Sequence, residues 1–179
     1  MRALLARSLE EGRFRGPAAR AMSVAWERAA ANRVVRPILL PERVPVVCVG
    51  GATLGGSGKT PLAVACAREL SRRGARTVLV GHAYRARPGC ARRVCGDEPV
   101  GVVGDEAIVA ARALEAEGVW VVVAPTRRQA LELAARHADV VVLDGVLQTT
   151  PRRAWLSWLA VDAEHPWGNA RSVPPVGDL

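Results

Sequence analysis

The feature that most constrains how this chain folds is a glycine-rich run at residues 55–60, which reads Gly-Gly-Ser-Gly-Lys-Thr. An apolar segment at 46–49, typical of a buried strand, precedes it, and a segment with helical apolar spacing at 60–73 follows it. Glycines let backbone N–H groups curl toward phosphate oxygens, and the N-terminus of the next helix adds further N–H groups. A turn of small residues is the alternative interpretation, but the strand–loop–helix setting favours a phosphate-binding loop over residues 53–60.

The composition marks out Lys59 within this loop. Of the 25 lysine and arginine residues, 24 are arginine, so the chain uses lysine at this position alone. A compact ammonium on a flexible stem reaches the β- and γ-phosphates in a way that a planar guanidinium does not. The net charge of +8 is compatible with an anionic membrane or a phosphorylated substrate. Nucleic acid is not expected, because only 4% of the residues are aromatic and the sequence contains no base-stacking motif.

Beyond residue 44 the pattern alternates between strands and helices. Apolar runs without polar alternation predict strands that are buried on both faces, and the segments between them have helical spacing. The predicted strands are 46–49, 77–80, 119–124, 140–143 and 155–161, and the predicted helices are 60–73, 105–117 and 127–136, with an Arg-, Gly- and Pro-rich loop at 82–97. This order predicts an α/β fold of the P-loop NTPase type, a parallel sheet with helices on both faces. Ligands of such sheets bind at the carboxyl ends of the strands.

Residues 1–43 differ in character and are predicted to form an N-terminal segment that precedes the nucleotide-binding core at 44–179. Apolar residues are interleaved with arginine and glutamate over 2–36, which predicts a basic, amphipathic helical segment. Such a segment can pack on the core, or it can lie on a membrane surface with arginine among the headgroups. The sequence contains no apolar run long enough to span a bilayer and no signal-peptide pattern, so we expect a cytoplasmic location.

Carboxylates end one predicted strand and open one predicted helix. Asp144 ends the fourth strand, where a P-loop protein places a Mg²⁺-binding acid to act with the loop threonine, Thr60. A turn-capping role is the alternative for Asp144. Asp105 and Glu106 open a helix, either as a cap or as a base or metal partner aimed at the nucleotide. Asp97 lies in a near-copy of the same Gly-Asp-Glu triplet, so the choice between Asp97 and Asp105 stays open, with Asp105 preferred.

Two further polar residues follow the second and third predicted strands. Tyr84, the only tyrosine, comes shortly after the strand at 77–80, and Arg127 comes shortly after the strand at 119–124. Arg127 can clamp an anionic substrate, and a solvated arginine at a helix start is the alternative. Both positions fall at the edge of the sheet where ligands are expected.

Together these segments resemble the tetraacyldisaccharide 4'-kinase family, the lipid A 4'-kinases. Residues 49–61, Val-Gly-Gly-Ala-Thr-Leu-Gly-Gly-Ser-Gly-Lys-Thr-Pro, match the family's V-G-N-x-T-x-G-G-T-G-K-T-P, including the first Thr and the final Pro that generic P-loops lack. The family's Ser-Arg-Gly-Tyr-Gly segment is similar to Gly-His-Ala-Tyr-Arg at 81–85, and its Gly-Asp-Glu is similar to residues 104–106. Its Asp-Asp-Gly-Leu-Gln-His is similar to Leu-Asp-Gly-Val-Leu-Gln-Thr at 143–149.

The resemblance implies transfer of the ATP γ-phosphate to the 4'-hydroxyl of a tetraacyldisaccharide 1-phosphate, a lipid A precursor. It implies that Thr60 and Asp144 hold Mg²⁺, and that Lys59 binds phosphates and serves catalysis. Asp105 is implied as the base that activates the hydroxyl, with Glu106 beside it. The implied ATP-binding residues are Thr53, Leu54, Gly55, Gly56, Ser57, Gly58, Lys59 and Thr60, and the implied substrate residues are Tyr84, Arg127 and Gln148. The family's N-terminal helices dock on the membrane, which implies a peripheral location on the cytoplasmic side of the bacterial inner membrane.

The sequence also departs from the family pattern. Leu143 replaces the first acid of the Asp-Asp pair, and Thr149 replaces the histidine after the glutamine. The family's second, C-terminal domain has no counterpart in this sequence, so we expect a fragment, a partner chain that completes the site, or a divergent relative. A non-catalytic ATP-binding relative and another small P-loop phosphotransferase are the alternative functions.

Overall fold

The computed structural model describes residues 16–34, 38–51, 57–83, 85–145, 153–164 and 166. The chain divides into two compact units. One comprises Pro37–Gly50 and Lys59–Leu159 and holds nearly all of the sheet. The other comprises Met1–Arg36, Gly51–Gly58 and Ala160–Leu179. The organisation expected from the sequence, with segments 1–43 and 44–179, stays a prediction.

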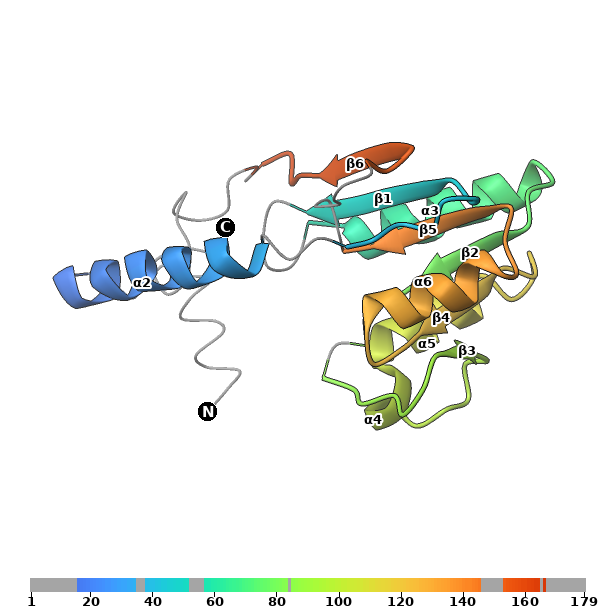
Figure 1. The fold of residues 1–179 in the computed structure, drawn as a ribbon, viewed down its shortest axis with the longest axis horizontal. Helices are drawn as coiled ribbons and strands as arrows, with labels where there is room; N and C mark the ends of the chain where they lie inside the picture. Colours follow the sequence, from blue (N-terminus) through green and yellow to red (C-terminus); the bar gives the residue numbers. More distant parts are fainter. Residues whose placement is uncertain are drawn as a thin grey trace. The chain divides into compact units, whose positions relative to one another are not determined.

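The described residues form a six-stranded sheet in the order β3-β4-β2-β5-β1-β6 (Figure 1). The strands are β1 (Val46–Gly51), β2 (Thr77–Val80), β3 (Arg92–Val94), β4 (Trp120–Val123), β5 (Val140–Asp144) and β6 (Leu156–Ala160). The pairs β1–β5, β5–β2 and β2–β4 are parallel, whereas β3 runs antiparallel to β4 at one edge. As a result, β5 lies between β1 and β2, although it follows both of them in the chain.

Helices cover both faces of this sheet. α3 (Lys59–Arg72) and α5 (Asp105–Ala113) pack on one face and α6 (Arg127–Ala135) packs on the other, as Figure 1 shows. The short helix α4 (Val100–Val103) comes directly before α5. β2 and β5 are buried along their whole length, because the side chains that alternate along each strand meet a helix on either face. These observations confirm the predicted α/β fold, a largely parallel sheet with helices on both faces.

The prediction of a loop at 82–97 is wrong over part of its length, because this segment contains β3. Val94 is buried at 3% exposure, and the Arg93 guanidinium lies 4.7 Å from the ring centroid of Trp120 on β4. These contacts with β4 hold a short edge strand in a segment whose arginine and glycine content favours a loop. α4 is also absent from the prediction, since Val-Gly-Val-Val has no helical apolar spacing.

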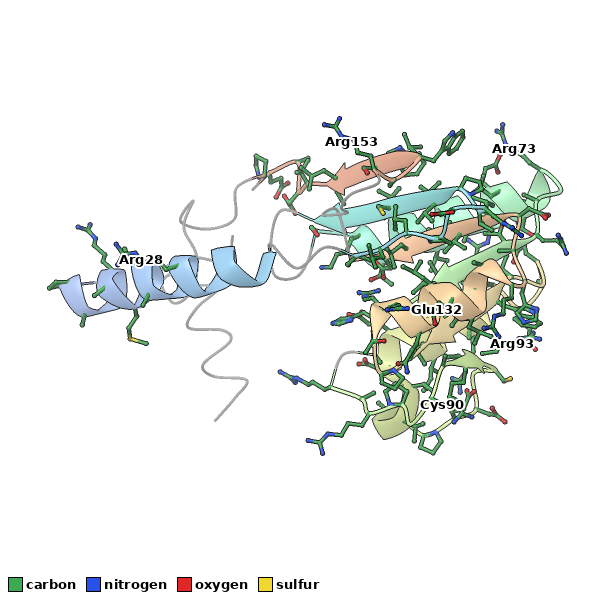
Figure 2. The ribbon with its side chains drawn as sticks, in the orientation of Figure 1. Arg28, Arg73, Cys90, Arg93, Glu132 and Arg153 are labelled. Carbon is green, nitrogen blue, oxygen red and sulfur yellow. The ribbon has the colours of Figure 1, made fainter. Side chains whose placement is uncertain are left out.

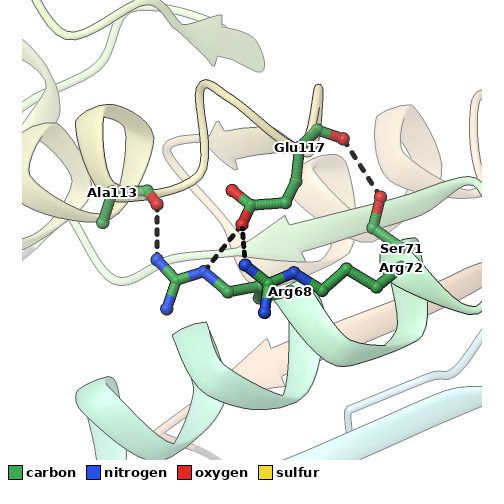
Figure 3. A network of polar contacts seen from close by, with 5 residues as sticks. All are labelled: Arg68, Ser71, Arg72, Ala113 and Glu117. Atoms are coloured by element: carbon green, nitrogen blue, oxygen red, sulfur yellow. Dashed lines mark hydrogen bonds and ion pairs between the residues drawn. The ribbon is translucent and has the colours of Figure 1, made fainter.

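A polar network joins the carboxyl-terminal ends of α3 and α5 (Figure 3). Glu117, shortly after α5, accepts hydrogen bonds from Arg68 Nε at 3.0 Å and from Arg72 Nη2 at 3.1 Å. The Ser71 hydroxyl donates to the backbone carbonyl of Glu117 at 3.0 Å, and Arg68 Nη2 donates to the Ala113 carbonyl at 2.6 Å. The network therefore fixes how the two helices lie on their common face. Both helices begin at residues of the predicted site.

α2 (Pro17–Val34) is the described part of the predicted N-terminal helical segment. Met22 and Val24 are exposed, whereas Ser23 between them is buried. Residues two apart on a helix point to different sides, so Met22 and Val24 do not share an apolar face. Within the described ranges, no helix is both long enough and apolar enough to cross a membrane.

Candidate functional site

A threonine–aspartate pair lies where the carboxyl ends of β1 and β5 meet the start of α3. The Thr60 hydroxyl, in the first turn of α3, donates a hydrogen bond to Asp144 Oδ2 at 2.8 Å. Asp144 is opposite Val49 of β1, and it shares a face of β5 with Val142, on the side that α3 covers. The structure thus brings together the two residues that were predicted as metal ligands.

Asp144 is a buried carboxylate with one unsatisfied oxygen. Only 3% of the residue is exposed, and among the described residues no group donates a hydrogen bond to Oδ1. Burial raises the pKa of Asp144, and the Thr60 hydrogen bond opposes that shift. The positive charges of Arg127, Lys59 and His82 also oppose it.

This donor set fits Mg²⁺. Mg²⁺ prefers oxygen ligands and is usually held by one or two protein groups, with water and phosphate oxygens completing its shell. A threonine hydroxyl beside a buried carboxylate with a free oxygen supplies such a partial set. In the described part of the chain no cluster of three or more His, Cys, Asp or Glu residues is arranged to hold a metal by itself.

Lys59 begins α3 and therefore stands at the helix N-terminus, next to Thr60. Gly58, which belongs to the other unit, has a φ of 73°, in the left-handed region that favours glycine. Ser57 is buried at 7% exposure, and its hydroxyl has no hydrogen-bond partner among the described residues. The remaining predicted site residues lie outside the described ranges; they are Thr53, Leu54, Gly55, Gly56, Tyr84 and Gln148.

Arg127 opens α6 and is turned toward the carboxyl edge of the sheet. Its Nη1 donates to the Gly81 carbonyl, directly after β2, at 3.2 Å. A Cβ atom built on Gly145 would lie 3.4 Å from Arg127 Nη2, so the guanidinium reaches the end of β5 as well. Burial lowers the pKa of Arg127, and the charge of Asp144 acts in the opposite direction. This geometry disfavours the alternative of a solvated arginine.

Asp105 and Glu106 form the first turn of α5. Asp105 Oδ1 accepts a hydrogen bond from the Glu106 N–H at 2.9 Å, which is a capping contact at the helix start. The pKa of Glu106 is raised, first by partial burial and then by the charge of Asp144, while Lys59 lowers it. Glu106 is therefore electrostatically coupled to the Thr60–Asp144 pair and its neighbouring lysine.

In the competing triplet at 96–98, the Glu98 side chain bonds to backbone N–H groups of its own turn. The Glu98 carboxylate accepts hydrogen bonds from the N–H groups of Cys95 and Gly96, with distances of 2.9–3.1 Å. Slight burial, the largest single influence, raises the pKa of Glu98, but the backbone hydrogen bonds and the charge of Arg92 together outweigh it, so the pKa is lowered. Asp97 is exposed. The structure therefore gives Glu98 a local turn-stabilising contact, and the preference for Asp105 over Asp97 stays a prediction.

A cavity beside Arg127 is lined by residues that sequence reasoning did not assign. Its volume is about 320 Å³, and it lies between residues 81–88, which follow β2, and residues 124–130, which include the start of α6. His82 and Arg87 line it together with Arg127. Burial lowers the pKa of His82, and the charge of Arg127 lowers it further. The sequence signals for His82 were its position after a strand and its place in the segment 81–85, which resembles a family motif. Arg87 shared only the position after a strand.

These features define a class of protein. A largely parallel sheet carries, at its carboxyl edge, a helix that begins with the only lysine, a threonine bonded to a buried carboxylate, and an inward-turned arginine. The helix start follows a glycine-rich run. This is the arrangement of a P-loop-type α/β protein, which binds phosphates at a helix N-terminus.

Within that class, the chain belongs to the tetraacyldisaccharide-1-P 4'-kinase (LpxK) family, whose model matches residues 19–179. A tetraacyldisaccharide 4'-kinase of Methylobacterium sp. (strain 4-46) is 39% identical over 147 residues, which cover 82% of this chain and 43% of that protein. The tetraacyldisaccharide 4'-kinase of Hahella chejuensis is 39% identical over 139 residues, covering 74% of this chain and 39% of that protein. These matches confirm the resemblance inferred from residues 49–61.

A solved structure has the same fold. LpxK from Aquifex aeolicus, crystallised in complex with ATP, superposes with a TM-score of 0.65 at 23% sequence identity, covering 87% of this chain and 49% of that one. The chain spans less than half the length of the curated relatives described above.

Proposed function

We propose that this chain supplies the ATP-binding part of a tetraacyldisaccharide 4'-kinase. The reaction transfers the γ-phosphate of ATP to the 4'-hydroxyl of a tetraacyldisaccharide 1-phosphate, a lipid A precursor, and releases ADP. One observation carries the proposal: the Thr60 hydroxyl is bonded to a buried Asp144 whose second oxygen is unsatisfied, at the N-terminus of the helix that begins with Lys59. Family membership and the fold support the same reaction.

The residues of the chain have separate tasks in this reaction. The N–H groups of residues 53–58 and the α3 N-terminus bind the phosphates of ATP, and the Lys59 ammonium neutralises β- and γ-phosphate oxygens. Thr60 and Asp144 would hold Mg²⁺, which supplies charge neutralisation of the transferred phosphoryl group when it is bound. Such catalysis consists mainly of positioning and electrostatic stabilisation.

The acceptor hydroxyl needs a base. Asp105, assisted by Glu106, takes the proton of the 4'-hydroxyl as the hydroxyl oxygen attacks the γ-phosphorus and the bond to ADP breaks. A carboxylate with a raised pKa is a stronger proton acceptor, and the pKa of Glu106 is raised by burial and by Asp144. Tyr84, Arg127 and Gln148 are proposed to contact the acceptor. The anchored guanidinium of Arg127 supports its role, because it is directed to the edge of the sheet.

The proposed location is the cytoplasmic face of the bacterial inner membrane, with peripheral attachment through the N-terminal helical segment. α2 carries exposed arginines, among them Arg20 and Arg28, the second of which is labelled in Figure 2. Guanidinium groups on a surface helix attract anionic headgroups, which supports attachment without a membrane span.

The edge strand β6 supports the proposal that further polypeptide completes the enzyme. Trp158 and Leu159 of β6 are 37% and 52% exposed, and Trp155, directly before β6, is 72% exposed, which is unusual for large apolar side chains. The curated relatives are more than twice as long as the part of them that matches this chain. We propose that the remaining part of the family fold, as further chain or as a partner chain, covers this strand and contributes to the site.

A nucleotide-binding relative without turnover is the second candidate function. Leu143, which replaces the first acid of the family pair, is fully buried and packs in the apolar core on the α6 side of the sheet. The position therefore offers no carboxylate to the site. This observation favours binding without catalysis in the chain alone.

Two measurements test the proposal. In calorimetric titrations with ATP, Lys59→Ala should weaken binding at least about tenfold, and Asp144→Asn should remove the strengthening of ATP binding by Mg²⁺. Arg136→Ala, at an exposed position after α6, is the control and should leave both unchanged. An unchanged ATP affinity in Lys59→Ala would overturn the assignment of the phosphate site.

The second measurement is the kinase assay itself. The chain is incubated with ATP, Mg²⁺ and tetraacyldisaccharide 1-phosphate, with and without the part of the family fold that it does not span, supplied as a separate chain. Phosphorylated lipid supports the kinase. ATP binding without product in either mixture would replace the kinase by the non-catalytic binding module.

A further inference from the structure

The helices α3 and α5 both run from the candidate site to the opposite edge of the sheet. α3 begins at Lys59 and α5 begins at Asp105, and both bury side chains in one apolar core. Far from these starts, the Arg68 side chain donates a hydrogen bond to the Ala113 carbonyl at 2.6 Å. Because a helix rises about 1.5 Å per residue, this bond lies roughly 12–14 Å along the helices from the site. It is too distant to touch a reactant, but it joins the two helices that present site residues.

Arg68 and Glu117 form the centre of this distant contact (Figure 3). Arg68 Nε donates to Glu117 Oε1 at 3.0 Å, while Nη2 of the same guanidinium donates to the Ala113 carbonyl. Ala113 is the last residue of α5, where carbonyl groups lack partners within the helix. A side chain of α3 therefore caps α5. The Ser71 hydroxyl, shortly before α3 ends, adds a bond to the Glu117 carbonyl.

The amino end of α5 has no comparable anchor. Gly104, with a φ of 91°, separates α5 from α4, and the start of α5 has no side-chain cap. Within the described ranges, no side-chain hydrogen bond or ion pair joins Asp105 or Glu106 to another element. Partial burial and the charge of Asp144 nevertheless raise the pKa of Glu106, and Lys59 lowers it. The place of Glu106 beside these charges therefore depends on how α5 lies as a whole.

We propose that Arg68 and Glu117 are positioning residues, whose bonds hold α5 so that Glu106 stays beside the phosphate site at the start of α3. The inference rests on the proposed kinase reaction, in which Glu106 assists the base. A short helix moves as a unit, so a shift of its carboxyl end displaces its first turn. A misplacement of about 1 Å at a site can cost on the order of 100-fold in rate. Arg68 and Glu117 thus act through Glu106 and not by touching a reactant.

Variants of Glu117 separate the hydrogen bonds from the charge. Glu117→Ala removes both side-chain bonds, whereas Glu117→Gln keeps an oxygen that can accept them from Arg68 and Arg72. Asp139→Ala is the matched control, because Asp139 bonds to Arg76 ahead of β2 and β5 and joins neither α3 nor α5 to the other. Each variant is assayed below its melting temperature with ATP, Mg²⁺, the acceptor and the part of the family fold that the chain does not span.

We expect Glu117→Ala to lower kcat roughly tenfold, with the KM for ATP unchanged within about twofold, because α3 keeps its phosphate contacts. Glu117→Gln should restore most of kcat, and Asp139→Ala should match the wild type. Ser71→Ala, which removes one bond of the same contact, is a milder variant and should change kcat in the same direction. A fall in kcat no greater than that of Asp139→Ala would overturn the proposal.

A double-mutant cycle tests whether the effect passes through Glu106. Mutations this far apart normally have additive effects. If Glu117 acts through Glu106, however, Glu117→Ala should lower kcat little further in a protein that already carries Glu106→Gln. Additive losses would show that Glu117 has a structural role alone and would refute the positioning role.

A second readout needs no turnover. The pKa of the Glu106 carboxyl is measured by NMR in this chain, where Asp144, Lys59 and Asp105 are the charges that influence it. A displaced α5 exposes the carboxyl and moves it from Asp144, so the pKa should fall toward its ordinary value in Glu117→Ala and keep its wild-type value in Glu117→Gln. An unchanged pKa in Glu117→Ala would count against the proposal. If the wild type forms no product but the pKa depends on Glu117, the kinase function falls and the positioning of Glu106 stands.

Discussion

The network around Glu117 allows a quantitative prediction for the variant Glu117→Ala. The Glu117 side chain is 13% exposed, and its partners Arg68 and Arg72 are 33% and 63% exposed. The better-shielded bond, to Arg68, is charge-assisted and should contribute about 1.5–3 kcal/mol. The bond to the exposed Arg72 should contribute about 0–1 kcal/mol. Because the Ser71 hydroxyl bonds to the backbone carbonyl of Glu117, that contact survives the substitution.

We therefore expect Glu117→Ala to lower the free energy of unfolding by about 2 kcal/mol. For a chain of this size that corresponds to a fall in melting temperature of roughly 4–8 °C, measured by circular dichroism. The matched control is Glu69→Ala, which removes an i,i+4 ion pair with Arg73 whose side chains are 56% and 74% exposed. The control should cost less than about 0.5 kcal/mol. Equal falls in the two variants would refute the argument that partial burial strengthens the Glu117 network.

Three further predictions concern the site. Burial raises the pKa of Asp144 above its ordinary 3.8, so the folded state binds the proton more tightly than the unfolded state and loses stability as the pH rises past that value. The melting temperature of Asp144→Asn should therefore rise relative to that of the wild type as the pH increases from about 4 to about 7. A difference between the two melting temperatures that stays constant over this range would contradict the argument. Glu106→Gln should slow phosphoryl transfer by roughly 100-fold at unchanged ATP affinity if Glu106 assists the base, which steady-state kinetics would measure. Gly145→Ala should cost about 1 kcal/mol, because Gly145 has a φ of 79° and a Cβ would lie 3.4 Å from Arg127 Nη2. Gly101→Ala, where a Cβ meets nothing within 4 Å, is the control in chemical denaturation and should not destabilise.

The sequence predicts the central strands well, because β1, β2, β4 and β5 are continuous apolar runs that need no information from distant residues. It also predicts that Thr60 and Asp144 meet, since both fall at the carboxyl edge of a parallel sheet. β3 escapes prediction, because its three residues are Arg-Arg-Val and their strand conformation depends on pairing with β4. The positive φ of Arg85 cannot be predicted from the sequence either, because it too depends on contacts with distant residues. No local pattern reveals that a non-glycine residue accepts strain in a turn whose position is fixed by the Arg87–Gly101 hydrogen bond.

The cavity beside Arg127 lies beyond sequence reasoning in a different way. Its lining comes from two stretches more than thirty residues apart, within 81–88 and 124–130, which meet because they follow the paired strands β2 and β4. His82 differs from the family residue in segment 81–85 and Arg87 lies outside that segment, so their place in the cavity lining emerges from the structure.

The central place of β5 has a bearing on synthesis of the protein by the ribosome. β1 and β2 emerge first, yet they do not pair with each other, because each forms its parallel ladder with β5. Until residue 144 has emerged, a nascent chain carries two apolar strands whose facing edges have no partner, a state prone to aggregation. Thr60 likewise precedes its partner Asp144 by 84 residues. Under the proposed function, nucleotide and Mg²⁺ would stabilise only chains whose sheet has closed, so their binding would report completed folding.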